Sequence, residues 1–210
     1  MALDTRGAEA CRKFIEQAAP KHPSLIDAAH VLDELFGITN VPSGVWIDEE
    51  GTIVRPPEPA WTRDQGYSRI EIPADATPDM IERINLVRGL RIEGDVYLAA
   101  IRDWVEEGSA SRFALLPDEV VRRSHPRSQE AATAAAHFEL GQHLHRAGYA
   151  EDAIPHFREA HRLQPENWTY KRQAWSLVDR TQGQADVYEG NWLKDVKASG
   201  PENYYPPFQP

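Results

Sequence analysis

The spacing of apolar positions changes along this chain. In the first third, short apolar runs at 1–4, 24–27 and 44–47 alternate with stretches in which apolar residues recur every three to four positions. The second spacing, at 8–19 and 28–36, is that of an amphipathic helix, whereas the short runs are typical of buried strands. We therefore predict mixed α/β structure for this part.

A β-hairpin is predicted where the third apolar run continues. Gly44 to Ile47 gives the first strand, Glu50-Gly51 a turn, and Thr52 to Val54 the second strand. Val41-Pro42 makes a corner just before it. This bond is a candidate for the cis form, because proline reduces the free-energy cost of cis to about 0.5–1 kcal/mol.

Beyond the hairpin the pattern becomes helical. The proline-rich stretch 55–59 predicts an extended exit, and 68–73 predicts a last short strand. Thr77 and Pro78 suit the N-cap and the first position of a helix. Helices are predicted at 79–90, 96–107 and 117–123.

The segment 134–165 carries small, apolar and helix-stopping residues at regular places. In chain order these are His137, Leu140, Gly141, Leu144, Gly148, Ala153, Phe157, Ala160 and Pro165. The pattern resembles the tetratricopeptide (TPR) repeat, although His137 and Leu144 stand where that family usually has Trp and Tyr. The resemblance implies two paired helices with the small Gly141 and Ala153 at their crossing and Phe157 beside them.

One such repeat cannot close a core, so other helices are expected to cover it. The segment 169–178 lies where the next repeat would begin, and Trp175 at its crossing position predicts a capping helix. We expect 201–210 to be an extended tail whose two tyrosines and Phe208 fold back. The TPR resemblance further implies a concave peptide-binding face lined by Ala135, Phe138, Gln142 and His145.

Three motifs near the hairpin occur in a familiar order: Val41-Pro42, Trp46-Ile47-Asp48 and Gly51-Thr52-Ile53. This order resembles the second half of the thioredoxin-like fold in TlpA, ResA and redoxin proteins. The resemblance implies strands at 1–4 and 24–27, with peptide binding at the Val41-Pro42 corner. In that family the catalytic dithiol lies in a strand–helix unit that precedes the equivalent of 1–4, and that unit is missing here.

The predicted fold class is α/β followed by all-α, with an incomplete thioredoxin-like αβ unit before a TPR-like helical domain. We expect a partial thioredoxin-like domain at 1–66, a helical connector at 67–125, a TPR-like hairpin with capping helices at 126–200 and the tail at 201–210. The missing unit would supply a strand inside the sheet, so the remaining strands would have unpaired backbone groups. A partner chain, or a second copy that completes the sheet, would satisfy them.

Charge and cysteine content exclude several classes of function. The net charge of −10 and the pI near 5.3 argue against a nucleic-acid partner. Cys11 is the single cysteine, which excludes an internal disulfide, a CxxC pair and a cysteine zinc site. Neither a leader-like start nor a run of eighteen apolar residues occurs, so we expect no membrane insertion and a cytoplasmic location.

Cys11 is the one candidate nucleophile. Arg12 and Lys13 could lower the pKa of its thiol, but a mid-helix position denies it the dipole of a helix N-terminus. We expect a buried, inert thiol; a one-cysteine peroxidase is the alternative. No GxSxG motif, phosphate loop or dinucleotide fingerprint occurs, so no cofactor is predicted.

Histidines are concentrated in the last third, at His137, His143, His145, His156 and His161. A metal site on one helix needs two ligands at i and i+4, and none of these pairs has that spacing. We therefore predict no metal site, with the histidines either solvated or between helices.

These patterns favour a non-catalytic thioredoxin-like/TPR protein that acts in protein or peptide binding. The residues expected to bind the partner are Val41, Pro42, Phe138, Gln142 and His145. The alternative is a fragment of a TlpA/redoxin-type thiol-disulfide oxidoreductase whose CxxC lies upstream of Met1. An upstream CxxC would separate the two.

Overall fold

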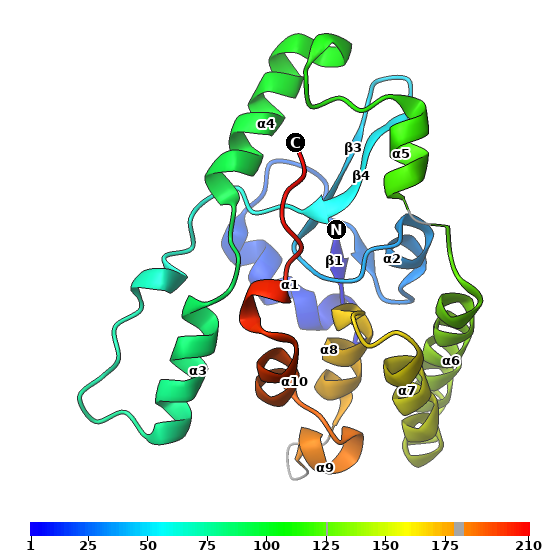
Figure 1. The fold of residues 1–210 in the computed structure, drawn as a ribbon. Coiled ribbons are helices and arrows are strands. Elements are labelled where there is room, and N and C mark those ends of the chain that lie inside the picture. The colour runs from blue at the N-terminus through cyan, green and yellow to red at the C-terminus, as the bar shows by residue number, and fades with distance from the viewer. Residues whose placement is uncertain (125, 179–182) are drawn as a thin grey trace. The chain divides into compact units, whose positions relative to one another are not determined.

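The described part of the chain is mostly helical and contains two small sheets (Figure 1). The computed structural model describes residues 1–124, 126–178 and 183–210.

Contacts divide the chain into two compact units. The first unit joins residues 1–39 to 126–189, and the second joins 40–125 to 190–210. Each unit therefore combines two segments that are distant in the sequence. The predicted domains were contiguous instead, because sequence patterns do not reveal that 1–39 packs with the helices of 126–189.

The first unit contains one parallel strand pair and most of the predicted repeat. Its elements are β1 (Ala2–Leu3), α1 (Ala8–Ala18), β2 (Ile26–Asp27), α2 (Val31–Phe36), α6 (Gln129–Arg146), α7 (Ala150–Leu163), α8 (Trp168–Leu177) and α9 (Gln184–Tyr188). Ala2 stands opposite Ile26 in the pair. The strands and helices predicted for 1–36 are thus confirmed.

Short polar side chains fix where three of these helices begin. The Asp27 carboxylate accepts hydrogen bonds from the backbone N–H groups of Val31 (3.1 Å) and Leu32 (2.7 Å) at the start of α2. Ser128 and Asn167 accept in the same way at the starts of α6 and α8. Each cap satisfies a donor that the first helical turn leaves without a partner.

The core of the first unit lies where α6, α7 and α8 meet (Figure 1). A methyl group at Gly141 would come within 2.9 Å of the Phe157 ring, so only glycine allows α6 and α7 to approach this closely. This close contact was predicted from the small residue at position 141. On α8, Ala174 and Trp175 are buried, as expected for a helix that covers the pair.

The second unit contains the hairpin, further helices and the tail. Its elements are β3 (Ser43–Ile47), β4 (Ile53–Pro59), the 3₁₀ turn η1 (Tyr67–Arg69), α3 (Pro78–Arg88), α4 (Gly94–Glu107), η2 (Gly108–Ala110), α5 (Pro117–Arg123), α10 (Trp192–Ser199) and η3 (Pro201–Asn203). The core consists of Trp46, Tyr97, Ala100, Phe113 and Phe208.

Two sequence predictions for this unit are wrong. Residues 55–59 belong to β4 instead of leaving the hairpin, and an irregular register near Trp46 accommodates the prolines, which cannot donate to a ladder. Residues 68–73 form no strand. The Ile70 carbonyl accepts a hydrogen bond from Nε of Arg88 (2.9 Å), so a helix side chain, and not a neighbouring strand, holds this segment.

Candidate functional site

The Val41–Pro42 corner is fastened to the hairpin. Its peptide bond is cis. The Val41 N–H donates to Oδ1 of Asn40 (2.9 Å), and the Pro42 carbonyl accepts from the N–H of Ala60 (3.2 Å). These bonds hold the corner in place, so the Val41 carbonyl is a fixed acceptor.

The C-terminal segment 204–209, which we call the tail, lies against this corner. Nδ2 of Asn40 donates to the carbonyl of Tyr204 (2.9 Å), and the Tyr205 hydroxyl donates to the carbonyl of Val41 (3.1 Å). The Tyr205 ring meets the edge of Trp61 at 5.5 Å. Corner and tail are therefore joined by two hydrogen bonds from side chains to backbone carbonyls and by aromatic contact.

Phe208 anchors the tail in the aromatic core of the second unit. Its ring is 9% exposed and contacts Tyr97 and Phe113, with ring centres 5.8 and 6.2 Å apart. Its backbone N–H donates to the Glu93 carboxylate (2.7 Å). The tail is thus held as an extended segment with one aromatic side chain in an aromatic pocket, as the fold-back prediction for Phe208 expected.

A fully buried arginine forms the wall behind that pocket. The guanidinium of Arg55 lies between the rings of Trp46 (5.2 Å) and Phe208 (4.8 Å). Its Nε and one terminal nitrogen each donate to the Glu58 carboxylate at 2.9 Å. Burial raises the pKa of Glu58, and the bonds from Arg55 act against that rise. A buried arginine needs such a partner, since an unpaired charge there would be costly.

Arginines also hold the end of the tail. The Gln209 carbonyl accepts from Arg55 and from Arg123, whose nitrogen lies 2.8 Å away. We call the surface that holds this segment the tail groove; it is formed by Asn40, Val41, Trp61, Tyr97 and Arg55. The groove offers hydrogen-bond donors and acceptors to an extended segment and aromatic rings to its aromatic side chains.

The residues expected to bind a peptide lie in different surroundings. Val41 and Pro42 are half-buried at the corner, next to the tail. Phe138 and Gln142 are buried in the first unit: Phe138 stacks on Tyr170 at 4.2 Å, and Nε2 of Gln142 donates to the Thr5 hydroxyl (2.9 Å).

The concave face predicted from the repeat is therefore filled at these two positions. Tyr170 of α8 and Thr5, just after β1, occupy it; the sequence predicted α8 as a capping helix, whereas nothing in the repeat pattern pointed to Thr5. His145 remains half-buried near the end of α6.

Cys11 lies in α1 and is 7% exposed. Burial is the main cause that raises the pKa of its thiol; the charge of Asp4 adds to the rise and that of Arg6 opposes it. Arg12, which was expected to favour the thiolate, pairs with Glu9 at 2.7 Å. These surroundings favour the neutral thiol.

Sequence reasoning missed a buried polar cluster between α2 and α8. Nδ1 of His30 lies 2.7 Å from a carboxylate oxygen of Asp33, and both side chains are 1% exposed. Next to them, the Glu34 carboxylate accepts from the Tyr170 hydroxyl and from Arg127 (2.8 Å). These contacts join α2 to later helices and have no periodic signal in the sequence.

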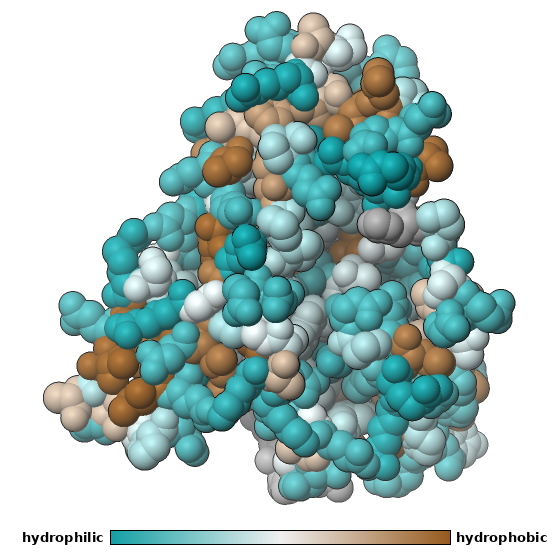
Figure 2. All heavy atoms as spheres, viewed as in Figure 1, coloured by the Kyte–Doolittle hydropathy of each residue, from teal (hydrophilic) through white to brown (hydrophobic). Residues whose placement is uncertain are grey.

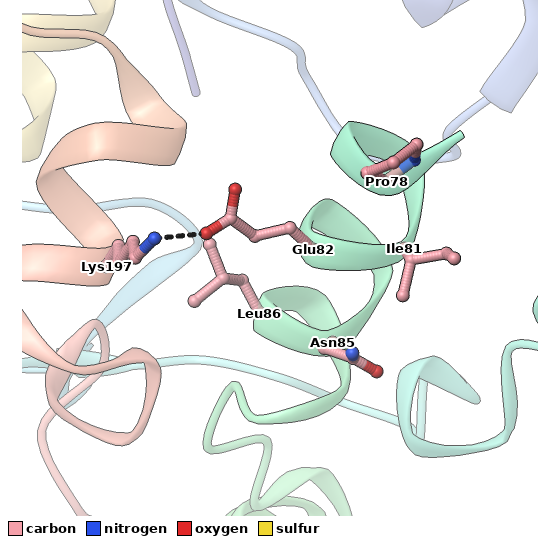
Figure 3. Close-up of a pocket in the computed structure, with 6 residues that line it drawn as sticks. All are labelled: Pro78, Ile81, Glu82, Asn85, Leu86 and Lys197. Atoms are coloured by element: carbon pink, nitrogen blue, oxygen red, sulfur yellow. Dashed lines mark hydrogen bonds and ion pairs between the residues drawn. The ribbon is translucent and has the colours of Figure 1, made fainter. Parts of the chain in front are cut away.

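A shallow pocket lies between α3 and α10 in the second unit (Figure 3). It encloses about 520 Å³ and is lined by Pro78, Ile81, Glu82, Asn85, Leu86 and Lys197. Lys197 pairs with Glu82 across it. Apolar side chains also reach the surface over α3 and the segment before it, among them Met80 (Figure 2). Glu82 and Lys197 are thus paired with each other, and the rest of the lining is apolar apart from Asn85.

The described residues contain neither a metal-binding cluster nor a membrane-spanning helix. Within residues 1–124, 126–178 and 183–210, no group of three or more His, Cys, Asp or Glu side chains could hold a metal ion. Among the helices described, none combines the length and apolar character needed to cross a bilayer. Comparison of the chain with protein-family models, with characterised proteins and with solved structures finds no match.

Proposed function

We propose that this chain is a non-catalytic binding protein that takes an extended protein or peptide segment into the tail groove at the Val41–Pro42 corner. One observation carries this proposal: the groove already holds an extended segment, the chain's own tail. The Asn40 side chain donates to a backbone carbonyl of the tail, which any extended segment can offer, and the Val41 carbonyl at the corner accepts from the Tyr205 hydroxyl, a donor that another side chain could supply.

The tail indicates what kind of segment would fit. It places an aromatic side chain against Tyr97 and Phe113, and prolines 206 and 207 restrict its backbone to extended conformations. A restricted backbone loses less conformational entropy on binding. We therefore expect partners with an aromatic residue next to proline.

The absence of catalysis is part of the proposal. Cys11 is buried and its raised thiol pKa disfavours the thiolate, so it is a poor nucleophile at neutral pH. The groove itself lies among backbone groups, rings and paired charges.

The proposal includes a thioredoxin-like part and a TPR-like part. The parallel β1–β2 pair, the cis corner and the β3–β4 hairpin support a thioredoxin-like part. The close approach of α6 and α7 at Gly141 supports a TPR-like helix pair. Within the described residues β1 pairs only with β2 and β3 only with β4, which leaves strand edges for a second copy. Sedimentation at increasing concentration tests that partner.

Fluorescence anisotropy with a labelled decapeptide of residues 201–210 tests the groove. In the wild-type chain the attached tail competes with the peptide at a high effective concentration, whereas Phe208→Ala removes the tail's main anchor. We expect the peptide to bind the F208A chain at least about tenfold more tightly than the wild type. Val105→Ala, an exposed apolar position of the same unit, is the matched control.

A second peptide in which the phenylalanine is replaced by alanine tests specificity. It should bind the F208A chain weakly, because nothing fills the aromatic pocket. Equal binding of both peptides, or no saturable binding to the F208A chain, rejects the proposal. If F208A unfolds, Tyr205→Phe removes only the hydroxyl that bonds to Val41 and serves as the milder variant.

A further inference from the structure

Two histidines from neighbouring helices face each other in the first unit. Nδ1 of His137 on α6 lies 3.0 Å from Nδ1 of His156 on α7, and the ring centres are 5.2 Å apart. Both side chains are half-buried, so solvent and small ions reach them. At this distance one Nδ1 donates a hydrogen bond to the other, so an ion that binds both nitrogens displaces that proton and leaves each ring neutral with its proton on Nε2. This neutral form presents the Nδ1 lone pair that binds metals.

The separation of the two nitrogens suits one metal ion. With metal–nitrogen bonds of about 2.0–2.1 Å, nitrogens 3.0 Å apart subtend an angle of about 91–97° at the ion. That angle matches neighbouring positions in octahedral or square-planar coordination. A tetrahedral zinc site would require the nitrogens about 3.3 Å apart. The geometry therefore favours Ni²⁺ and Cu²⁺, which also bind nitrogen ligands strongly in the divalent series.

The helix packing preorganises the pair. Gly141 lies one turn after His137, and the ring of Phe157, next to His156, packs directly against it. Phe157 is fully buried, so the core fixes the spacing of the two helices at this point. Two ligands held at a fixed spacing lose little freedom when an ion bridges them.

A carboxylate lies near the pair. Arg162 is the main cause that lowers the pKa of Glu159, and the charge of His137 contributes less. Glu159 stands three residues after His156 on α7, and its negative charge favours a bound cation nearby. Because Arg162 holds it at 2.6 Å, we do not count Glu159 as a ligand.

We propose that His137 and His156 together bind one divalent nickel or copper ion, each through Nδ1, and leave the other coordination positions to water or an external ligand. With two protein ligands the ion would be exchangeable and its remaining positions accessible. The site depends on the distance between α6 and α7, and not on the tail groove, so it stands or falls independently of the proposed peptide binding.

Calorimetric titration of the untagged full chain with Ni²⁺ or Cu²⁺, after treatment with chelator, tests the site. We expect one ion per chain. His137→Gln and His156→Gln each leave only one of the two imidazole ligands, so the ion loses the gain from binding both at once. Each variant should therefore bind the ion about a hundredfold more weakly. His143→Gln, an exposed histidine of the same helix, is the matched control and should bind like the wild type.

Electron paramagnetic resonance of the Cu²⁺-loaded wild type provides a readout without any variant. Coupling to two imidazole nitrogens is expected. A spectrum without nitrogen coupling, the absence of saturable binding, or an affinity of H137Q and H156Q equal to that of H143Q overturns the proposal. Circular dichroism checks that the variants remain helical. If they do not, the spectrum of the copper-loaded wild type alone decides whether the two imidazoles bind the ion.

Discussion

The guanidinium of Arg55 lies 4.8 Å from the centre of the Phe208 ring, with both side chains buried in the second unit. This contact joins the hairpin to the tail. It also places the positive charge beside a ring that attracts cations, while the Glu58 carboxylate balances that charge from β4. Removing either charge would therefore leave the other one buried.

Arg55→Met tests this dependence. The substitution leaves the buried Glu58 carboxylate without its partner, so we expect the free energy of unfolding to fall by about 3–5 kcal/mol. Urea denaturation measures it. Arg122→Met, at an exposed pair with Glu119, is the control and should change stability little. Similar losses for both variants would show that burial does not govern the Arg55 pair.

Gly141→Ala tests the close approach of α6 and α7. On an exposed helix this change stabilises by about 1 kcal/mol, but here the added methyl group would lie 2.9 Å from Phe157. We expect instead a loss of about 1–3 kcal/mol in unfolding free energy.

A second substitution, Phe157→Leu, tests whether contact with the ring causes the loss of stability in G141A. Phe157→Leu shortens the ring that the methyl group meets, so G141A should cost less in the F157L background than alone. If the cost is the same in both backgrounds, the contact with the ring is not what excludes alanine at position 141.

Glu34 makes stability depend on pH. Burial raises its pKa, while Tyr170 and Arg127 act against the rise. Because its folded-state pKa lies above the unfolded one, the stabilisation from protonating Glu34 is fully present below the unfolded value and is lost as pH rises through the folded value. The wild type should therefore gain stability relative to Glu34→Gln as pH falls from 7 towards 4.5.

The effect of Glu119 on stability should change with pH in the opposite direction. Arg122 and Arg123 lower its pKa to about 2, so its contribution is present above the unfolded value and is lost as pH falls towards 2. Urea midpoints of the wild type, E34Q and E119Q across this range measure both effects. If the difference between the wild type and E34Q does not change with pH, Glu34 does not titrate as its surroundings indicate.

Cys11 should react slowly with an aromatic disulfide reagent at neutral pH. Its thiol is buried and its pKa is raised, so little thiolate meets the reagent. Unfolding the chain in urea should increase the rate strongly. Rapid reaction of the folded chain would instead support the one-cysteine peroxidase.

Local structure followed from the sequence, because it depends on residues that are close along the chain. Periodic apolar positions gave the helices, Gly51 the turn, Thr77 a cap and Val41-Pro42 the corner. The strand predicted at 68–73 failed for a reason that is not local: nothing near this segment shows that Arg88, eighteen residues further on, would bind the Ile70 carbonyl in place of a strand.

Only the tertiary structure decided which distant residues meet. Phe138 is buried against Tyr170 of α8 and Gln142 against Thr5 just after β1, and the tail groove exists because Phe208 reaches Arg55. The histidine pair likewise brings together positions on two helices, which no spacing on one helix could indicate. Periodicity reports which face of an element is apolar, whereas the partner of that face is set by the path of the whole chain.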